Sequence, residues 1–96
     1  MEYLGTKADF DNLLEENKRN GKLLVVDFTA SWCPPCKMIA PKYEAMAAEF
    51  DTCVLVKCDV DQNAETAQAA NIECMPTFKF YKGGSEVAKL EGASES

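Results

Sequence analysis

Two cysteines, Cys33 and Cys36, stand three positions apart just beyond an apolar run of the chain. Thiols at this spacing can hold half of a metal site, form a fixed cross-link, or exchange electrons with other thiols and disulfides. A helix that begins at Cys33 directs its free amide groups and the positive end of its dipole at that sulfur, which favours the thiolate over the thiol. Cys36 lies one turn further along, within bonding distance but more shielded. The spacing therefore predicts an exposed attacking thiol at Cys33 and a buried resolving thiol at Cys36.

The two residues between these cysteines are Pro34 and Pro35. Proline fits the first positions of a helix, because the amide groups there have no partner within the helix. The two rings stiffen the loop, so that little conformational entropy changes when a disulfide opens or closes. They also remove two donors that would otherwise solvate a thiolate at Cys33.

A zinc site is the main alternative for these thiols, with Cys53, Cys58 or Cys74 completing it. The chain has no histidine and no second C-x2-C pair, and Cys53 and Cys58 stand five apart in an expected strand, where they face opposite sides. A chance pairing of two buried thiols is the other alternative, which the position after a strand disfavours. We expect no metal and no cofactor.

Composition is typical of a globular protein with a single domain over residues 1–96, because 47% of the residues are hydrophobic and 27% are charged. The formal net charge of −6, from 16 acids and 10 bases, argues against binding to a nucleic-acid backbone. No apolar run approaches the roughly 18–20 residues of a membrane-spanning helix, and the opening residues lack the basic and apolar regions of a secretory signal. Five cysteines, an odd number, fit poorly with a secreted disulfide framework. We therefore expect a cytoplasmic protein with no nucleic-acid or membrane partner.

The elements that must position the cysteine pair alternate between helix and strand. Residues 23–30 form an apolar run broken only by Asp27, which predicts a strand buried on both faces, as in parallel sheets. Thr6, followed three positions later by Asp9, predicts a capped helix start. The expected order of helix, strand, helix, strand, helix, strand, strand predicts an α/β fold with a partly parallel sheet and an antiparallel edge. The expected ranges are 6–20, 23–30, 33–50, 53–60 and 63–71, then two strands around the glycine pair at 83–84, with a short extra strand at 2–4.

The run DFTASWCPPCK at residues 27–37, the later MPTF at 75–78 and a glycine at Gly92 together resemble the thioredoxin family over nearly the whole chain. The resemblance implies the thioredoxin fold, with a central mixed β-sheet flanked by helices. It also implies a thiol–disulfide oxidoreductase that reduces protein disulfides through Cys33 and Cys36. Its electrons would come from a thioredoxin reductase-like flavoprotein. A thioredoxin-like binding or scaffold module, regulated by its redox state, is the alternative function.

Two features depart from the usual family pattern. Thioredoxins usually carry Gly-Pro between the cysteines, whereas Pro34 and Pro35 are both proline, as in tryparedoxins, so the sequence does not define the electron donor. The family fold also ends with an amphipathic helix after the glycine, whereas only ASES follows Gly92. We therefore expect a C-terminally truncated domain that lacks this helix and leaves part of one sheet face uncovered. A monomer is expected, with a dimer through that face or through Cys74 as the alternative.

The resemblance also implies roles for residues near the cysteine pair. Cys33 resembles the family nucleophile, Cys36 the resolving thiol, and Trp32 the aromatic residue that flanks the site and touches substrate. Asp27 matches the buried acid beneath the pair, and burial in an apolar strand raises the pKa of such a carboxyl, so that it can take the proton from Cys36. The alternative is a structural acid paired with Lys57 on the neighbouring strand.

Pro76 matches the family's cis-proline opposite the redox pair, the alternative being a trans proline at the start of a strand. The backbone of Met75 would then pair with an extended substrate segment. Ile72, Met75, Gly92 and Ala93 would complete the apolar docking surface, with a core role as the alternative for Ile72.

Cys74 lies next to that docking surface. We expect oxidation or intermolecular pairing of this thiol to block substrate docking. The alternative is a half-buried thiol with no role. For Cys53 and Cys58 we expect core positions.

Overall fold

The computed structural model describes residues 1–92 and places seven elements along them in the expected order. The helices are α1 (Lys7–Asn20), α2 (Pro34–Glu49) and α3 (Ala64–Ala69), and the strands are β1 (Leu23–Thr29), β2 (Cys53–Asp59), β3 (Thr77–Lys82) and β4 (Ser85–Glu91). The third helix is shorter than the sequence predicts, and the expected strand at 2–4 is reduced to one parallel bridge between Tyr3 and Lys57. None of the helices within residues 1–92 has the length and apolar character needed to cross a bilayer.

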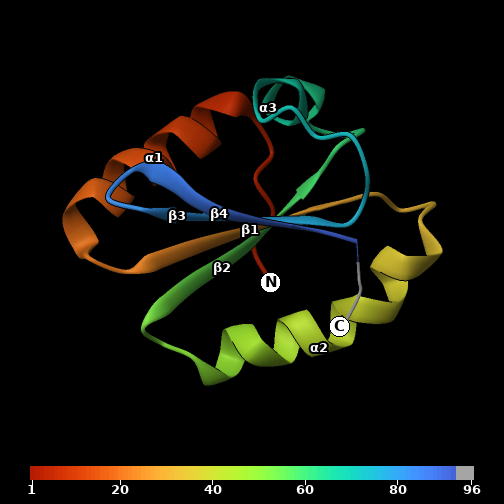
Figure 1. Cartoon of the computed structure of the whole chain (residues 1–96), viewed down its shortest axis with the longest axis horizontal. Coiled ribbons are helices and arrows are strands. Elements are labelled where there is room, and N and C mark those ends of the chain that lie inside the picture. The colour runs from red at the N-terminus through yellow and green to blue at the C-terminus, as the bar shows by residue number, and fades with distance from the viewer. Residues whose placement is uncertain (93–96) are drawn as a thin grey trace.

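The strands form one mixed sheet in the order β2–β1–β3–β4. β1 runs parallel to β2, with Val26 opposite Val56, and antiparallel to β3. β3 in turn pairs antiparallel with the edge strand β4. Helices α1 and α3 lie on one face of the sheet and α2 lies on the other (Figure 1). This arrangement confirms the expected α/β fold with a central mixed sheet flanked by helices.

The central strand β1 is buried on both faces, which explains why its sequence is apolar apart from Asp27 and Thr29. Phe28 is fully buried and belongs to a core that also contains Tyr81, on the face covered by α1. Val25 belongs to a second core, with Tyr43 of α2 and Phe78 of β3. Alternate side chains of one strand therefore connect two separate apolar layers.

Helix α1 has the ends that its sequence predicts. The Thr6 hydroxyl accepts a hydrogen bond from the Asp9 amide at 3.1 Å, and the Asp9 carboxylate accepts one from the Thr6 amide at 3.2 Å. The helix stops at Gly21, whose φ of 68° lies in the left-handed region that glycine adopts without strain. Near this end, the buried Asn17 accepts a hydrogen bond from the Gly84 amide at 2.7 Å and so holds the β3–β4 turn against the helix.

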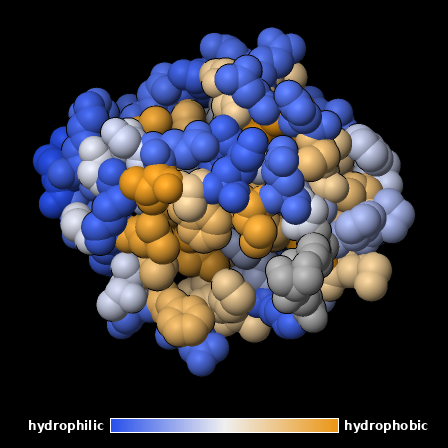
Figure 2. Space-filling view, in the orientation of Figure 1, coloured by the Kyte–Doolittle hydropathy of each residue, from blue (hydrophilic) through white to orange (hydrophobic). Residues whose placement is uncertain are grey.

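The α2 face of the sheet is partly open. Within residues 1–92 no helix follows β4, as the sequence predicts, and the side chains of β4 are exposed along its length. A groove of about 300 Å³ lies between α2 and the sheet, with Ile39, Phe50, Phe80 and Leu90 among its lining residues. Figure 2 shows apolar side chains gathered on this side of the molecule.

Candidate active site

Cys33 occupies the N-cap position of α2, with Pro34 and Pro35 as the first two residues of the helix. Its backbone is extended, with φ of −95° and ψ of 109°. The Cys33 sulfur accepts a hydrogen bond from the Cys36 amide at 3.3 Å. The prolines thus fill positions whose amides have no partner in the helix, and the remaining free amide of the first turn is directed at the sulfur.

Cys33 and Cys36 form a disulfide across the first turn of α2, with their Cα atoms 5.3 Å apart. Each residue is only 3% exposed, so the expected contrast between an exposed Cys33 and a buried Cys36 is wrong for the disulfide state. The reason is local packing, because both cysteines belong to one cluster with Ala30 and are covered by Val60 and Met75.

The segment that follows α3 passes beside this disulfide. The Met75–Pro76 peptide bond is cis, as the sequence predicts. The Met75 carbonyl oxygen lies 3.7 Å from the Cys33 sulfur, a contact that becomes a hydrogen bond only when that sulfur carries a proton. The Gly92 amide donates to the Pro76 carbonyl at 2.7 Å, so Gly92 lies beside this segment, with a left-handed φ of 80°. Ala93 lies outside the described residues.

Trp32 is 60% exposed next to the disulfide, and its indole Nε1 donates a hydrogen bond to the Asp61 carboxylate at 2.8 Å. The turn that carries Asp61 is closed by Asp59, whose carboxylate accepts from the Asp61 and Gln62 amides. Asp61 as the partner of Trp32 was not predicted from the sequence. The acid-rich turn DVDQN after a buried strand was the only signal available for it.

Asp27 is 1% exposed in β1, and its Oδ1 atom has no hydrogen-bond partner among the described residues. Burial raises the pKa of Asp27 to about 6, although the positive charge of Lys57 lowers it in part. Tyr43 of α2 packs on the same face of the sheet, where its hydroxyl lies 2.8 Å from the Val56 carbonyl and 3.0 Å from the Val25 carbonyl. Burial also raises the pKa of Tyr43. A carboxyl in this setting can gain and lose a proton near neutral pH.

Lys57 lies opposite Asp27 on β2 and is 4% exposed. Its ammonium forms an ion pair with Glu44 of α2 at 3.1 Å and lies 5.5 Å from the centre of the Tyr3 ring. Burial works against the charge on Lys57, but the hydrogen bond to Glu44 and the neighbouring charges outweigh it and raise its pKa. Lys57 thus lies on the strand next to Asp27, as expected, whereas its ion pair with Glu44 was not predicted from the sequence.

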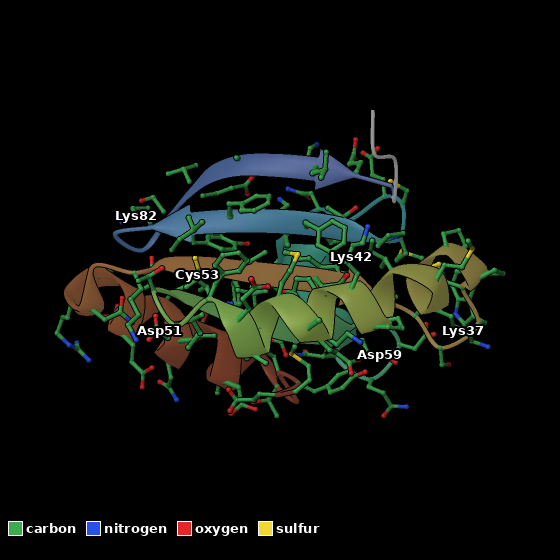
Figure 3. All side chains as sticks on the ribbon, turned by 90° about the horizontal axis from the view of Figure 1, so that it is seen from below. Lys37, Lys42, Asp51, Cys53, Asp59 and Lys82 are labelled. Atoms are coloured by element: carbon green, nitrogen blue, oxygen red, sulfur yellow. A yellow bond between two sulfur atoms is a disulfide. The ribbon has the colours of Figure 1, made fainter. Side chains whose placement is uncertain are left out.

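The remaining expected positions fall on both sides of the sheet. Ile72 is half-buried and packs against the core under α1, while Cys74 is exposed, with its sulfur 3.8 Å from the Thr77 hydroxyl. Cys58 is fully buried, and burial raises its pKa to about 11. Cys53 is half-exposed and lines the groove beside α2, where Figure 3 shows it between the helix and β3, so it is only partly a core residue. The two strand cysteines therefore face opposite sides, as expected. No group of three or more metal-ligating side chains gathers within residues 1–92.

A disulfide closed across the first turn of a helix, beside a cis-proline and an exposed indole, can exchange with the thiols of other molecules, and its reduced dithiol with their disulfides. Fold and site together define the class of thiol–disulfide oxidoreductases. The thioredoxin family model matches residues 3–96, and the chain belongs to the thioredoxin family.

Individual relatives agree with this assignment. The chain is 53% identical to a thioredoxin of Geodia cydonium, over 100% of this chain and 90% of that protein. It is 45% identical to thioredoxin 1 of Plasmodium falciparum, over 100% of this chain and 88% of that protein. Among solved structures, Fasciola hepatica thioredoxin superposes with a TM-score of 0.93 at 50% identity, over 99% of this chain and 89% of that one. Protein disulfides as substrates and a reductase as partner follow from membership of the family.

Proposed function

We propose that this chain reduces protein disulfides, with Cys33 as the attacking thiol and Cys36 as the resolving thiol. The observation that carries the proposal is the position of Cys33 at the start of α2, where its sulfur accepts the Cys36 amide hydrogen bond at 3.3 Å. A hydrogen-bond donor and the positive end of a helix dipole both stabilise a thiolate at this point.

The exchange proceeds in two steps. The Cys33 thiolate attacks one sulfur of a substrate disulfide, forming a mixed disulfide and releasing the other substrate sulfur as a thiolate, which takes up a proton from solvent. Cys36 then loses its proton and attacks the Cys33 sulfur. The second substrate sulfur leaves as a thiolate, and the Cys33–Cys36 disulfide forms. Two electrons pass from the enzyme thiols to the substrate disulfide.

Asp27 is the proposed acceptor of the Cys36 proton. Its buried carboxyl has a pKa of about 6 and an oxygen without a hydrogen-bond partner among the described residues. A base with a pKa near neutrality is well matched to this transfer. Lys57 forms an ion pair with Glu44, and its positive charge partly lowers the raised pKa of Asp27. This effect on the Asp27 pKa is the supporting role proposed for Lys57.

The substrate segment is proposed to dock along the segment that carries Met75 and Pro76. The Met75 carbonyl faces the Cys33 sulfur, so a strand paired with the Met75 backbone would bring its own sulfur close to Cys33. Trp32 offers an exposed apolar surface on the other side of the disulfide. Ile72, Gly92 and Ala93 remain proposed members of the same docking surface.

Turnover of insulin with dithiothreitol as reductant tests the reaction. The parent should reduce insulin, Cys33→Ser should be inactive, and Cys36→Ser should accumulate a mixed disulfide with the substrate. Equal rates for the parent and Cys33→Ser would remove the proposal and favour the alternative, a binding module without reductase activity.

The electron donor is proposed to be a flavoprotein of the thioredoxin reductase type, and the compartment the cytoplasm, since five cysteines of which three are free suit a reducing environment. NADPH consumption in a coupled assay with such a reductase tests the donor. If only a glutathione-dependent donor reduces the Cys33–Cys36 disulfide, the proposed donor is wrong.

Cys74 is proposed as a regulatory thiol of an otherwise monomeric protein, because it is exposed one residue before Met75. Oxidation should produce covalent dimers that no longer reduce insulin, and Cys74→Ser should prevent both effects. Covalent dimers of Cys74→Ser at the parental rate would show that this thiol is not responsible.

A further inference from the structure

A lysine lies buried in the middle of the sheet. Lys79 belongs to β3, opposite Val26 of β1 and Lys89 of β4, and is 6% exposed. An ammonium group loses its hydration on burial and remains charged only where hydrogen bonds and an opposite charge replace the lost water. The partners of Lys79 therefore indicate why a charge is retained at this place.

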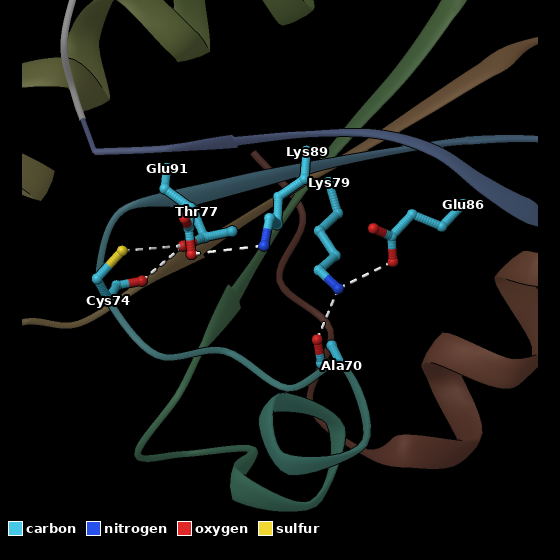
Figure 4. A network of polar contacts seen from close by, with 7 residues as sticks. All are labelled: Ala70, Cys74, Thr77, Lys79, Glu86, Lys89 and Glu91. Carbon is cyan, nitrogen blue, oxygen red and sulfur yellow. Dashed lines mark hydrogen bonds and ion pairs between the residues drawn. The ribbon is translucent and has the colours of Figure 1, made fainter.

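Two groups surround the Lys79 ammonium. It donates a hydrogen bond to the Ala70 carbonyl at 2.6 Å and forms an ion pair with Glu86 of β4 at 2.9 Å (Figure 4). Ala70 is the C-cap residue of α3, where backbone carbonyls lack helical partners and a cation is favourable. The ammonium thus joins the end of α3 to the edge strand of the sheet.

The chain leaves Ala70 through Asn71, whose φ of 57° is left-handed, and enters the segment at residues 71–76, which we name the docking loop. Its far end is held from the same strand, because the Thr77 hydroxyl donates to the Cys74 carbonyl at 2.6 Å. Thr77 and Lys79 are two positions apart in β3 and share one face of the sheet. Figure 4 shows both anchors reaching this loop from β3.

Met75, the residue that contacts the Cys33 sulfur, directly follows Cys74, the second of the two positions held from β3. Among residues 1–92 the Lys79 ammonium bonds to the Ala70 carbonyl and to Glu86 and to neither Cys33 nor Cys36, and the exchange reaction makes no use of its charge. Its effect on the reaction must therefore pass through the docking loop.

We infer that Lys79 is a positioning residue for protein substrates. Its ammonium ties the start of the docking loop to Glu86 of β4 and thereby holds the Met75 backbone where an extended substrate segment pairs with it. The inference rests on the proposed docking role of Met75. A small disulfide reaches Cys33 without pairing along the loop, so Lys79 distinguishes protein substrates from small ones.

The test compares Lys79→Met with the parent on two substrates, insulin and bis(2-hydroxyethyl) disulfide, with the same reductant. The variant keeps the length of the side chain and removes both anchoring bonds. We expect KM for insulin to rise about tenfold, the change that corresponds to about 1.4 kcal/mol of lost binding, while kcat and turnover of the small disulfide stay within about twofold.

Lys82→Met is the matched control, since Lys82 ends the same strand, is exposed, and bonds to the Gly21 carbonyl at the far end of the sheet. It should leave both activities at the parental level. Glu86→Gln removes only the ion-pair charge from an exposed side chain and should raise KM for insulin in the same direction by a smaller factor. This variant decides the question if Lys79→Met does not fold.

An unchanged insulin KM in Lys79→Met, or in Glu86→Gln where the first variant is unfolded, would overturn the inference. So would an equal loss of activity on insulin and on the small disulfide, which would indicate a general structural role. A parent that reduces insulin no faster than Cys33→Ser would instead overturn the proposed function, before any Lys79 variant is compared.

Discussion

Asp27 is a carboxyl inside a strand whose neighbouring side chains are apolar and fully buried. Its pKa is raised from an ordinary value of 3.8 to about 6, mainly by burial, with the charge of Lys57 acting in the opposite direction. The folded protein therefore holds a proton on Asp27 between about pH 4 and pH 6, where the unfolded chain has released it. In this window the free energy of unfolding falls as the pH rises, and above pH 6 the loss is complete.

Replacement of Asp27 by asparagine should remove this loss. Because a shift of one pKa unit corresponds to about 1.4 kcal/mol, Asp27→Asn should be more stable than the parent by up to about 3 kcal/mol at pH 7.5. The difference should vanish below about pH 3, where the carboxyl is protonated in both states. Guanidinium denaturation of the disulfide forms at the two pH values measures it. Asp51→Asn, in an exposed turn, is the control, and a gain for Asp27→Asn that is the same at both pH values would contradict the explanation.

The same substitution should slow the reaction. Only ionised Asp27 accepts the Cys36 proton, so the rate of mixed-disulfide resolution in the parent should rise as the pH passes through about 6. In Asp27→Asn this rise should be absent, and the rate at pH 7 should be about 100-fold lower than in the parent. Trp32 is the only tryptophan of the chain, and its fluorescence next to the disulfide provides a signal for single-turnover measurements. Parental resolution rates in the variant would exclude Asp27 as the proton acceptor.

At the scale of elements, the start of α2 determines the state of the reactive sulfur. Cys33 is the N-cap, and among the first three residues of the helix only Cys36 offers an amide to it, because Pro34 and Pro35 have none. Side chains at an N-cap ordinarily accept from the second or third amide of the helix. The double proline therefore limits how well the helix solvates the thiolate.

Restoring one amide should change the acidity of the pair. In Pro35→Ala the second amide of α2 becomes available to the Cys33 sulfur, and a hydrogen bond worth about 1 kcal/mol should let the thiolate form at a pH lower by about 0.5–1 unit. The pH dependence of Cys33 alkylation by iodoacetamide in the reduced protein measures the change. Pro41→Ala, two turns further into the helix, controls for general effects of losing a proline. Alkylation curves that coincide for the parent and Pro35→Ala would mean that the second amide does not reach the sulfur.

The helices and strands were also the part of the structure that the sequence predicted best. The apolar run at 23–30, broken only by Asp27, predicts the central, doubly buried β1, and the Thr6–Asp9 pair predicts the start of α1, because each signal is local in the sequence. Contacts between distant residues were not predictable in the same way. Glu44, Asp61 and Lys79 are ordinary charged residues in the sequence, and only the packing of α2, the turn after β2 and the end of α3 gives them their partners. The burial of Cys33 was missed for the same reason, since the docking loop that covers it lies some forty residues away.

The molecule as a whole depends on β1, which carries both apolar cores. Phe28 belongs to the core under α1, and Val25 to the core under α2, with only the strand backbone between them. The redox pair begins four residues after β1 ends, so the position of Cys33 depends on the packing of both layers. A chain built in this way should unfold as one cooperative unit, although one of its cores is partly open.

Phe28→Ala tests this connection. The substitution opens a cavity in the α1 core and should lower the free energy of unfolding by about 3–5 kcal/mol, whereas Val87→Ala, at a position 59% exposed on β4, should change it by less than about 0.5 kcal/mol. In Phe28→Ala the transition midpoints followed by far-ultraviolet circular dichroism and by Trp32 fluorescence should shift by the same amount, because both layers unfold together. Trp32 lies just before α2, outside the damaged core, so its fluorescence reports on the other layer. If the fluorescence transition stayed at its parental midpoint while the dichroism transition moved, the two layers would be independent, and the active site would be supported by the α2 layer alone.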